Sequence, residues 1–376
     1  MPASPDPVLP AYGEGYIGGV VEALRKRQRH RWLPEIATEA AQIVLLVLDG
    51  LGWEQLQARR DLAPTMAGLA GGPITSVVPT TTATALTSIT TGLPPAGHGV
   101  VGYRVRVVGT GPDGGDEVLN LLRWRTASGD ARPRIDPLTF QPNRPFSGDP
   151  VPVVTKGEFA GTGFSAAHLT GARMVGWHVP SSLVVEVRRL LAAGEPFVYA
   201  YYDGVDRVAH EYGLDEHYDA EVAFADRLVA DLAAVLPPDA ALAVTSDHGQ
   251  VHVGQNVIGI DPELMGRVSM LSGEGRFRWL HSSDRSDGGV DKLFGEVCDA
   301  YHELAWVCTR EEMEGWGWFG GPLTDSARSR LGDVAVVAHA PVAFLDPADT
   351  GDVRLVSRHG SLTAAEMLVS LLVAAR

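Results

Sequence analysis

Four short apolar runs along the chain predict buried strands. Each is rich in aliphatic or aromatic residues and soon gives way to Asp or His, where a strand would pass into a loop. The runs span residues 43–48, 196–201, 241–245 and 334–337. Residues 218–236 carry apolar side chains at the spacing of an amphipathic helix. This alternation predicts an α/β fold, with a mainly parallel sheet covered by helices on both faces.

Two stretches interrupt the alternation. Residues 104–150 are rich in Gly, Asp, Arg and Pro, which indicates a long loop excursion. Residues 251–332 mix short β-like runs with Gly clusters, and their length of about 80 residues suffices for a small domain. We therefore expect a main core formed by residues 1–250 and 333–376, with residues 251–332 inserted as a cap.

Charge and composition limit the functions that the chain can have. Its 376 residues include 46 acidic and 31 basic side chains, a formal charge of −15. An acidic balance of this size repels polyanions and argues against binding of a nucleic-acid polymer. The two cysteines are too few for a disulfide scaffold, and the apolar runs are too short to cross a membrane. With no secretory signal pattern near Met1, we expect a cytoplasmic protein with no membrane partner.

Polar residues that can bind metals follow three of the predicted strands. Asp49 comes directly after the first strand, although a turn or a helix cap would also explain an Asp there. Asp206 and His210 are four residues apart, so they share one face of a predicted helix and can hold one cation, although such pairs also arise by chance. Beyond the third strand, Asp247 and His248 can reach one ion only if the chain turns at the following glycine.

A second His-Gly pair, beginning at His359, repeats this arrangement near the end of the chain. Immediately after it, Thr363 and Glu366 have the spacing of a capping box, which predicts a final helix. Together the fragments supply three carboxylates and three imidazoles. The positive charges of two divalent cations would balance the negative charges of three carboxylates and of one ionised hydroxyl that acts as nucleophile. This balance favours a binuclear site suited to phosphoryl transfer.

A threonine-rich segment, residues 78–92, contains a candidate nucleophile. Its second half has helical character and is expected to end at Gly92. A hydroxyl at the start of that helix lies beside free N–H groups and the positive end of the helix dipole, which favour an alkoxide and a phosphate. Thr81, Thr82 and Thr84 could each fill this role, or could cap the helix instead.

The order Asp, Thr, Asp-x-x-x-His, Asp-His-Gly, His-Gly resembles that of the alkaline phosphatase superfamily, and within it the type I phosphodiesterase/nucleotide pyrophosphatase family. The resemblance implies an alkaline phosphatase-like core in which Asp49, Asp247, His248 and the nucleophile hold one metal. It assigns the other metal to Asp206, His210 and His359, makes Thr82 the nucleophile, and gives His98 a structural role.

One departure from the family pattern concerns the phosphate contact. The resemblance leads us to expect an Asn three residues after the nucleophile, but this position is Ala85. The contact must then come from backbone N–H groups near Ala83, from Thr84, or from an insertion residue such as Lys156 or Arg125. Trp124 and Arg125 could also stack on a base and contact phosphate, with burial in the insertion's core as the alternative for Trp124.

Compartment and motif spacing are most similar to those of the bacterial cyclic di-AMP phosphodiesterases of this family. This resemblance implies that cyclic di-AMP is opened to the linear dinucleotide and then to AMP, through a phospho-threonine intermediate on Thr82, with two Mn²⁺ or Zn²⁺ ions. A phosphomonoesterase or phosphonate hydrolase on the same site is the first alternative. The second is a nucleotide receptor without catalysis.

Overall fold

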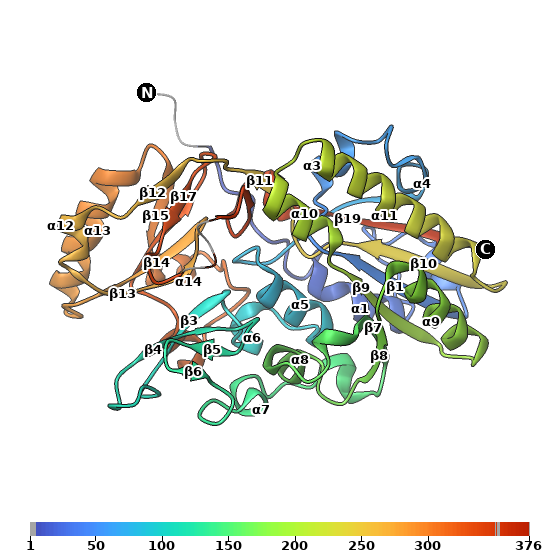
Figure 1. The fold of residues 1–376 in the computed structure, drawn as a ribbon, viewed down its shortest axis with the longest axis horizontal. Helices are drawn as coiled ribbons and strands as arrows, with labels where there is room; N and C mark the ends of the chain where they lie inside the picture. The colour runs from blue at the N-terminus through green and yellow to red at the C-terminus, as the bar shows by residue number, and fades with distance from the viewer. Residues whose placement is uncertain (1–4, 350, 352–353, 376) are drawn as a thin grey trace.

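A seven-stranded sheet, parallel through most of its width, forms the centre of the larger part of the molecule (Figure 1). The computed structural model describes residues 5–349, 351 and 354–375. In sheet order the strands are β2 (Ala70–Thr75), β19 (Leu368–Ala375), β10 (Ala240–Thr245), β1 (Gln42–Leu48), β9 (Phe197–Tyr202), β7 (Pro152–Lys156) and β8 (Arg173–Trp177). Strands β10, β1, β9, β7 and β8 run parallel, while β19 is antiparallel to both of its neighbours. The predicted α/β class is therefore confirmed.

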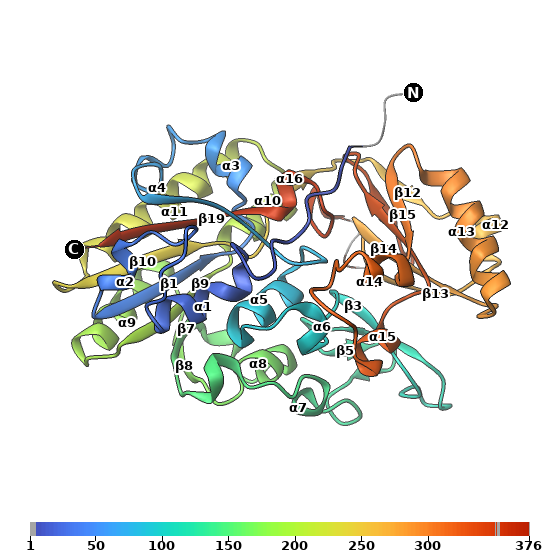
Figure 2. The ribbon, with the colours of Figure 1, turned by 180° about the vertical axis from the view of Figure 1, so that it is seen from behind.

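Helices cover both faces of this sheet, because alternate residues of the buried strands face opposite sides. In β1, Ile43 and Leu45 belong to one apolar cluster, and Val44 and Leu46 to the other. Figures 1 and 2 show the two faces. One carries α1 (Ile17–Arg25), α5 (Thr82–Thr91) and α8 (Gly163–His168); the other carries α3 (Trp53–Gln57), α4 (Pro64–Ala67), α9 (Pro180–Ala192), α10 (Gly204–Tyr212) and α11 (Glu216–Ala234). Helix α11 confirms the helix expected over residues 218–236.

A second, antiparallel sheet lies beside the first and has its own apolar cluster. Its strands are β13 (Val268–Glu274), β14 (Phe277–Ser282), β16 (Val334–Ala338) and β15 (Ala305–Thr309), accompanied by β12 (Val257–Gly259), β17 (Ala343–Leu345), α12 (Pro262–Met265), α13 (Asp287–Tyr301), α14 (Arg310–Gly315) and α15 (Asp325–Arg330). Residues 334–337 were expected in the parallel sheet, and this prediction was wrong. A fully buried apolar strand has the same pattern in either kind of sheet. The cap boundaries at 251 and 332 stay a prediction.

Residues 104–150 also contain more regular structure than a loop. Four short strands pair in the order β3 (Arg104–Val107), β4 (Glu117–Asn120), β5 (Arg125–Thr126) and β6 (Gly129–Asp130), followed by α7 (Pro137–Phe140) and the 3-10 turn η1 (Pro145–Gly148). Strands of two to four residues are too short to show a period in the sequence. The remaining short elements are α2 (Ile36–Glu39), α6 (Pro95–His98), η2 (Gly157–Phe159), β11 (Val251–His252) and β18 (Ser357–Arg358).

The end of the chain is a strand and not the expected helix. Helix α16 (Ala364–Met367) has only four residues and leads directly into β19. The Glu366 carboxylate, expected to cap a helix, accepts two hydrogen bonds of 2.8 Å from the buried guanidinium of Arg276, between β13 and β14. This ion pair joins the two sheets. Within the described residues, no helix is both long and apolar enough to span a membrane.

His98 at the end of α6 gives a prediction about stability and pH. Its Nδ1 accepts a hydrogen bond from the Val100 N–H, and burial, assisted by the Arg330 cation, lowers the pKa of His98 to about 3. The unfolded chain therefore binds a proton below about pH 6.5 that the folded protein does not bind, and stability is lost as the pH falls. Between pH 7.5 and 5, this residue should lower the free energy of unfolding by about 2 kcal/mol.

Urea unfolding of the wild-type protein and of His98→Gln at both pH values measures this contribution. The variant should be less stable at pH 7.5 but should lose about 2 kcal/mol less than the wild type on acidification. Equal losses in the two proteins would contradict the prediction.

Candidate metal centre and nucleophile

The predicted site residues come together beyond the carboxyl ends of three adjacent strands. Asp49 follows β1, Asp206 and His210 lie on α10 just after β9, and Asp247 and His248 follow β10. His359 follows β18, which pairs with β11, and so reaches the same place from the far end of the chain. Parallel strands bring their carboxyl ends to one edge of a sheet, which explains the convergence.

One candidate metal group consists of Asp206, His210 and His359. The Asp206 Oδ1 lies 3.3 Å from the His210 Nε2 and 3.8 Å from the His359 Nε2. In both imidazoles the Nδ1 lies within hydrogen-bond distance of a backbone carbonyl, 2.7 Å from Ser357 and 2.8 Å from Thr80. A carbonyl only accepts, so each Nδ1 carries the proton and each Nε2 presents a lone pair to the group, as in metal-ligating histidines.

The second candidate group surrounds His248. Its Nε2 lies 3.4 Å from the Asp49 Oδ1, 3.4 Å from the Asp247 Oδ2 and 3.1 Å from the Thr82 Oγ1. Two ligand atoms about 2.0–2.1 Å from one tetrahedral ion are about 3.3 Å apart, so these separations suit a shared cation. Asp206 belongs to this group as well as to the first, with its ligand atom within 4.8 Å of those of Asp49 and His248.

Asp49 and Asp247, which lie beside His248, are held so that one oxygen of each stays unbonded. Asp247 accepts hydrogen bonds at Oδ1 from the backbone N–H groups of Gly50 and His248, at 3.1 and 3.0 Å. Asp49 accepts one at Oδ2 from the Tyr201 hydroxyl. The Asp49 Oδ1 and the Asp247 Oδ2 are buried and have no hydrogen-bond partner among the described residues. Buried carboxylate oxygens require a partner, and cations at these positions would supply it.

The shifted pKa values of the acidic and imidazole groups also fit a site that holds cations. Burial, together with the neighbouring carboxylates of Asp247 and Asp206, raises the pKa of Asp49 well above its usual value. Burial also raises the pKa of Asp247. For His359, burial and then the His248 and His210 rings lower the pKa, so its ring is neutral. Acidic oxygens and neutral imidazoles are a ligand set for divalent transition metals.

Thr82 is the first residue of α5 and lies next to both groups. Its side chain is 8% exposed and lines two cavities together with Asp206 and His210. Of the alternatives, Thr84 is fully buried and lines neither cavity, while Thr81 lines only the smaller one. The Thr81 side chain makes no capping hydrogen bond. Helix α5 ends at Gly92 with φ +75°, as expected.

The substrate contacts expected near Trp124 need correction. Trp124 is only 1% exposed, donates from its Nε1 to the Ile135 carbonyl at 2.9 Å and packs edge-on against Phe140. It is a core residue and presents no face to a base. Arg125 is exposed and lines neither cavity at Thr82, whereas Arg123 lines both. Between these two arginines, Trp124 has a left-handed backbone, φ +50°, which was not evident from the sequence.

The other three proposed phosphate contacts are also constrained. Thr84 is fully buried and lines neither cavity at Thr82. The Lys156 ammonium lies 2.6 Å from the Asp203 carboxylate, so it is already paired. The Ala83 side chain is fully buried in the core, which leaves its backbone N–H, in the first turn of α5, as the group that an anion could reach. Tyr201 and Gly50, which position the aspartates, were not identified from the sequence. Gly50 has φ +76°, and a Cβ there would lie 2.8 Å from the Asp206 Cβ.

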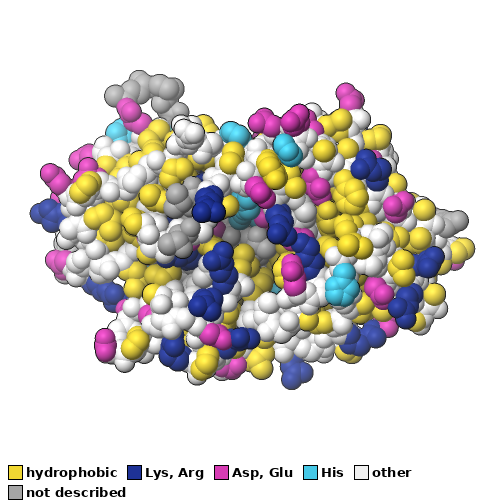
Figure 3. Space-filling view, in the orientation of Figure 1, with side chains coloured by type: hydrophobic (Ala, Val, Ile, Leu, Met, Phe, Trp, Pro, Cys, Tyr) yellow, Lys and Arg dark blue, Asp and Glu magenta, His cyan; other side chains and the backbone are white. Residues whose placement is uncertain are grey.

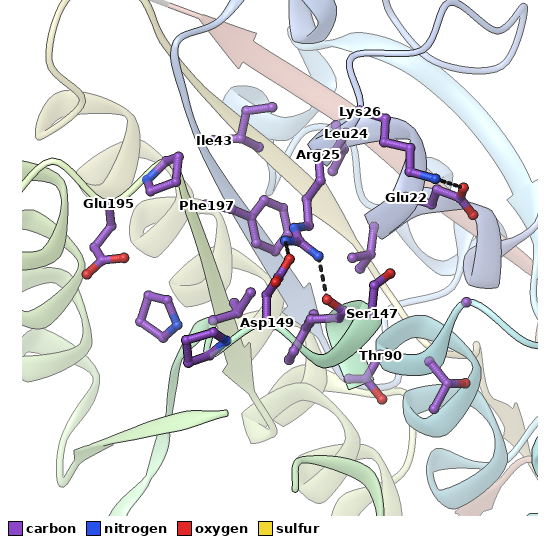
Figure 4. Close-up of a pocket in the computed structure, with 18 of the residues that line it drawn as sticks. Glu22, Leu24, Arg25, Lys26, Ile43, Thr90, Ser147, Asp149, Glu195 and Phe197 are labelled. Atoms are coloured by element: carbon purple, nitrogen blue, oxygen red, sulfur yellow. Dashed lines mark hydrogen bonds and ion pairs between the residues drawn. The ribbon is translucent and has the colours of Figure 1, made fainter. Parts of the chain in front are cut away.

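The cavities at Thr82 differ in size and lining. The smaller, about 260 Å³, is lined by Tyr103, Glu274 and Arg358, among others, and the larger, about 740 Å³, extends between β9 and α8. Figure 3 shows basic side chains gathered around the middle of this face of the molecule. Another cavity of about 650 Å³ lies at the opposite edge of the sheet, near the starts of β1 and β9, where Ile43 and Phe197 line it (Figure 4). No predicted site residue lines it.

Solved structures with the same fold support the assignment of the architecture. Phosphonoacetate hydrolase from Sinorhizobium meliloti 1021, in complex with phosphonoacetate, matches with a TM-score of 0.64 and 20% identity, covering 89% of this chain and 90% of that one. Human ectonucleotide pyrophosphatase/phosphodiesterase 5 matches with a TM-score of 0.62 and 15% identity, and the match covers 89% of this chain and 88% of the human chain. An inactive variant of the murine enzyme, in complex with AMP, matches with a TM-score of 0.59 and 18% identity, and the match covers 88% of this chain and 87% of the murine chain.

Sequence comparison identifies the family. A search of curated proteins finds no match to this chain. The profile of type I phosphodiesterase/nucleotide pyrophosphatase, a family of hydrolases, matches residues 43–187 and 187–362, which include all seven predicted metal-site residues. The chain therefore belongs to the type I phosphodiesterase/nucleotide pyrophosphatase family.

Proposed function

We propose that this protein is a two-metal phosphodiesterase that hydrolyses a small nucleotide phosphodiester with Thr82 as its nucleophile. The observation that carries the proposal is the position of the Thr82 Oγ1, 3.1 Å from the His248 Nε2 and beside the unbonded oxygens of Asp49 and Asp247. The murine neighbour of this fold has AMP bound, which supports a nucleotide substrate.

The chain's own groups define the course of the reaction. Two divalent cations, one held by Asp49, Asp247 and His248 and one by Asp206, His210 and His359, would supply Lewis-acid stabilisation of the attacking and leaving oxygens. The Thr82 hydroxyl loses its proton and its oxygen attacks phosphorus; the bond to the leaving oxygen breaks, and that oxygen takes up a proton to leave as the alcohol. The remaining phosphoryl ester stays on the Thr82 oxygen until water attacks phosphorus, releases the phosphate monoester and returns a proton to Thr82. The free N–H groups in the first turn of α5 face the developing negative charge.

Arg123 is expected to bind the substrate's phosphate in place of Arg125. It lines both cavities at Thr82, and no ion pair of its guanidinium is found among the described residues. A guanidinium binds phosphate with two parallel hydrogen bonds. Arg123→Ala should therefore raise KM for bis-p-nitrophenyl phosphate about tenfold or more, measured by release of p-nitrophenol.

The matched control is Arg125→Ala, which removes an exposed arginine two residues away and should leave KM unchanged. If the two variants behaved alike, the assignment of the phosphate contact to Arg123 would be wrong. If only Arg125→Ala raised KM, the result would support the phosphate contact by Arg125 that the sequence predicted.

A phosphonate hydrolase is the second candidate, because the fold also matches phosphonoacetate hydrolase. A substrate panel separates the candidates: bis-p-nitrophenyl phosphate, p-nitrophenyl phosphate, phosphonoacetate and cyclic di-AMP, each with Mn²⁺ or Zn²⁺. We expect the diester to be hydrolysed faster than the monoester, and cyclic di-AMP to yield the linear dinucleotide and then AMP. Release of acetate from phosphonoacetate would favour the second candidate, and binding of cyclic di-AMP without any product would favour a receptor.

A further inference from the structure

The cavity at the opposite edge of the central sheet from Thr82 combines an apolar lining with a charged mouth (Figure 4). Its volume of about 650 Å³ is within the range of cavities that bind organic ligands. It lies between α1, the end of α5 and the η1 turn, near the starts of β1 and β9. The apolar lining includes the buried side chains of Val21, Val151 and Phe197 and the exposed residues Pro150 and Pro196.

The η1 turn, which forms one wall of this cavity, has a strained backbone. Phe146 and Ser147 have φ of +52° and +59°, values that residues other than glycine rarely adopt. Arg25 holds the turn, because its Nη1 donates to the Phe146 carbonyl at 2.7 Å and its Nη2 donates to Asp149. Figure 4 shows Arg25 extending past Phe197 toward Asp149, and the guanidinium carbon lies 6.0 Å from the centre of the Phe197 ring. Strain of this kind is characteristic of segments that clamp ligands, and Arg25 shapes the cavity before a ligand enters.

The mouth of the cavity has one cation more than it has anions. Three pairs of opposite charge lie around it: Arg25 with Asp149, Lys26 with Glu22, and Arg173 with Glu195. The remaining cation is the exposed Arg27, for which no ion pair is found in the described part of the chain. Its Nη2 donates to the Ala41 carbonyl at 3.0 Å, which leaves the guanidinium with other N–H donors for an anion.

This cavity and the nucleophile lie at opposite ends of α5. Thr82 is the first residue of the helix, whereas Thr90 and Thr91, at its other end, line the cavity. A helix of ten residues is about 15 Å long, so a ligand in this cavity would touch neither Thr82 nor the metal groups. The cavity is therefore separate from the candidate catalytic site.

We propose that this cavity is a second ligand site, which binds an amphipathic organic anion. The apolar body of the ligand packs against Val151 and Phe197, and its anionic group accepts hydrogen bonds from Arg27. Carboxylates already pair with the other three cations at the mouth, so the site favours a ligand with a single anionic group. The proposal does not depend on the proposed function, because its test requires no turnover.

Two fluorescent probes with the same apolar body test this proposal: 8-anilinonaphthalene-1-sulfonate, which is an anion, and N-phenyl-1-naphthylamine, which lacks the sulfonate. Arg27→Gln should weaken binding of the anion about fivefold to tenfold and leave binding of the uncharged probe unchanged. Phe197→Leu should weaken both probes to a similar extent, because it reduces the apolar contact that they share. Fluorescence titration measures both affinities.

Arg29→Gln is the matched control for the charge. Arg29 is also exposed, but it pairs with Glu35 at 2.9 Å and does not line the cavity. This variant should bind both probes as the wild type does. Arg123→Gln, at the cavities near Thr82, should do so too, because the probes do not bind at the catalytic site. Calorimetric unfolding should show that each variant is folded.

The proposal would be overturned if the wild type failed to bind the anion, or if Arg27→Gln bound it as tightly as the wild type. It would also fail if Arg29→Gln weakened binding as much as Arg27→Gln, since any exposed charge would then suffice. Weaker binding of the anion to Arg123→Gln would place it at Thr82 instead. None of these results bears on the diester assays, so the proposed function stands or fails separately.

Discussion

Replacing Thr82 with Ala is expected to reduce phosphodiester turnover by at least about a thousandfold, because it removes the attacking oxygen. The six Asp and His side chains that form the two metal groups remain, so both cations should still bind. Turnover of bis-p-nitrophenyl phosphate and metal content by atomic emission measure the two properties on the same sample. Loss of activity together with loss of both metals would instead show that Thr82 acts mainly as a ligand.

Thr84→Ala is the matched control for this substitution. Thr84 lies on the same helix, two residues further along, and its hydroxyl is buried without a hydrogen-bond partner among the described residues. Its removal should leave turnover within about threefold of the wild type. The reverse outcome, an active Thr82→Ala and an inactive Thr84→Ala, would move the nucleophile to Thr84.

Asp206→Asn should have the second largest effect, because this carboxylate belongs to both candidate metal groups. The substitution preserves the shape of the side chain but removes a negative charge between the two sites. We expect metal affinity and kcat each to fall by more than about a hundredfold, and metal-dependent stabilisation against heat to be largely lost. Titration calorimetry with Mn²⁺ and a melting curve with and without a chelator provide the readouts.

The exposed aspartate Asp231 on α11 provides the comparison. Asp231→Asn makes the same change in net charge far from the site and should leave metal binding as in the wild type. Unaltered affinity in Asp206→Asn would mean that the carboxylate serves another purpose, such as its hydrogen bond from Gln250.

The sequence predicted the strands and the metal-site residues best where the signal was local. Apolar runs before Asp49 and Asp247 predicted two buried strands correctly, and the i, i+4 spacing predicted that Asp206 and His210 share a helix face. His359 was grouped with these residues because its His-Gly pair repeats that of His248, and the family resemblance then assigned it to a metal, although nothing local connects residues so far apart in sequence. The structure brings all of them together, with Asp206 between the groups.

The failures have equally specific causes. Residues 334–337 were assigned to the wrong sheet because an apolar run shows burial but does not identify the neighbouring strands. The capping-box spacing at Thr363 correctly predicted the start of a helix, but α16 has only four residues before β19 begins, and Glu366 also binds the buried Arg276. For Trp124 the sequence left open substrate stacking or burial in the core, and the structure confirms burial, with a left-handed backbone that composition does not reveal.

The buried pair of Arg276 and Glu366 has a consequence for how the two sheets depend on each other. Both side chains are fully buried, and the Arg276 Nε and Nη2 atoms each donate to one Glu366 oxygen. Removing either side chain alone would leave the other charge buried without its partner, at a cost of about 3–5 kcal/mol. A substitution at Arg276, between β13 and β14 of the antiparallel sheet, should therefore also weaken the segment that leads into β19 of the larger sheet.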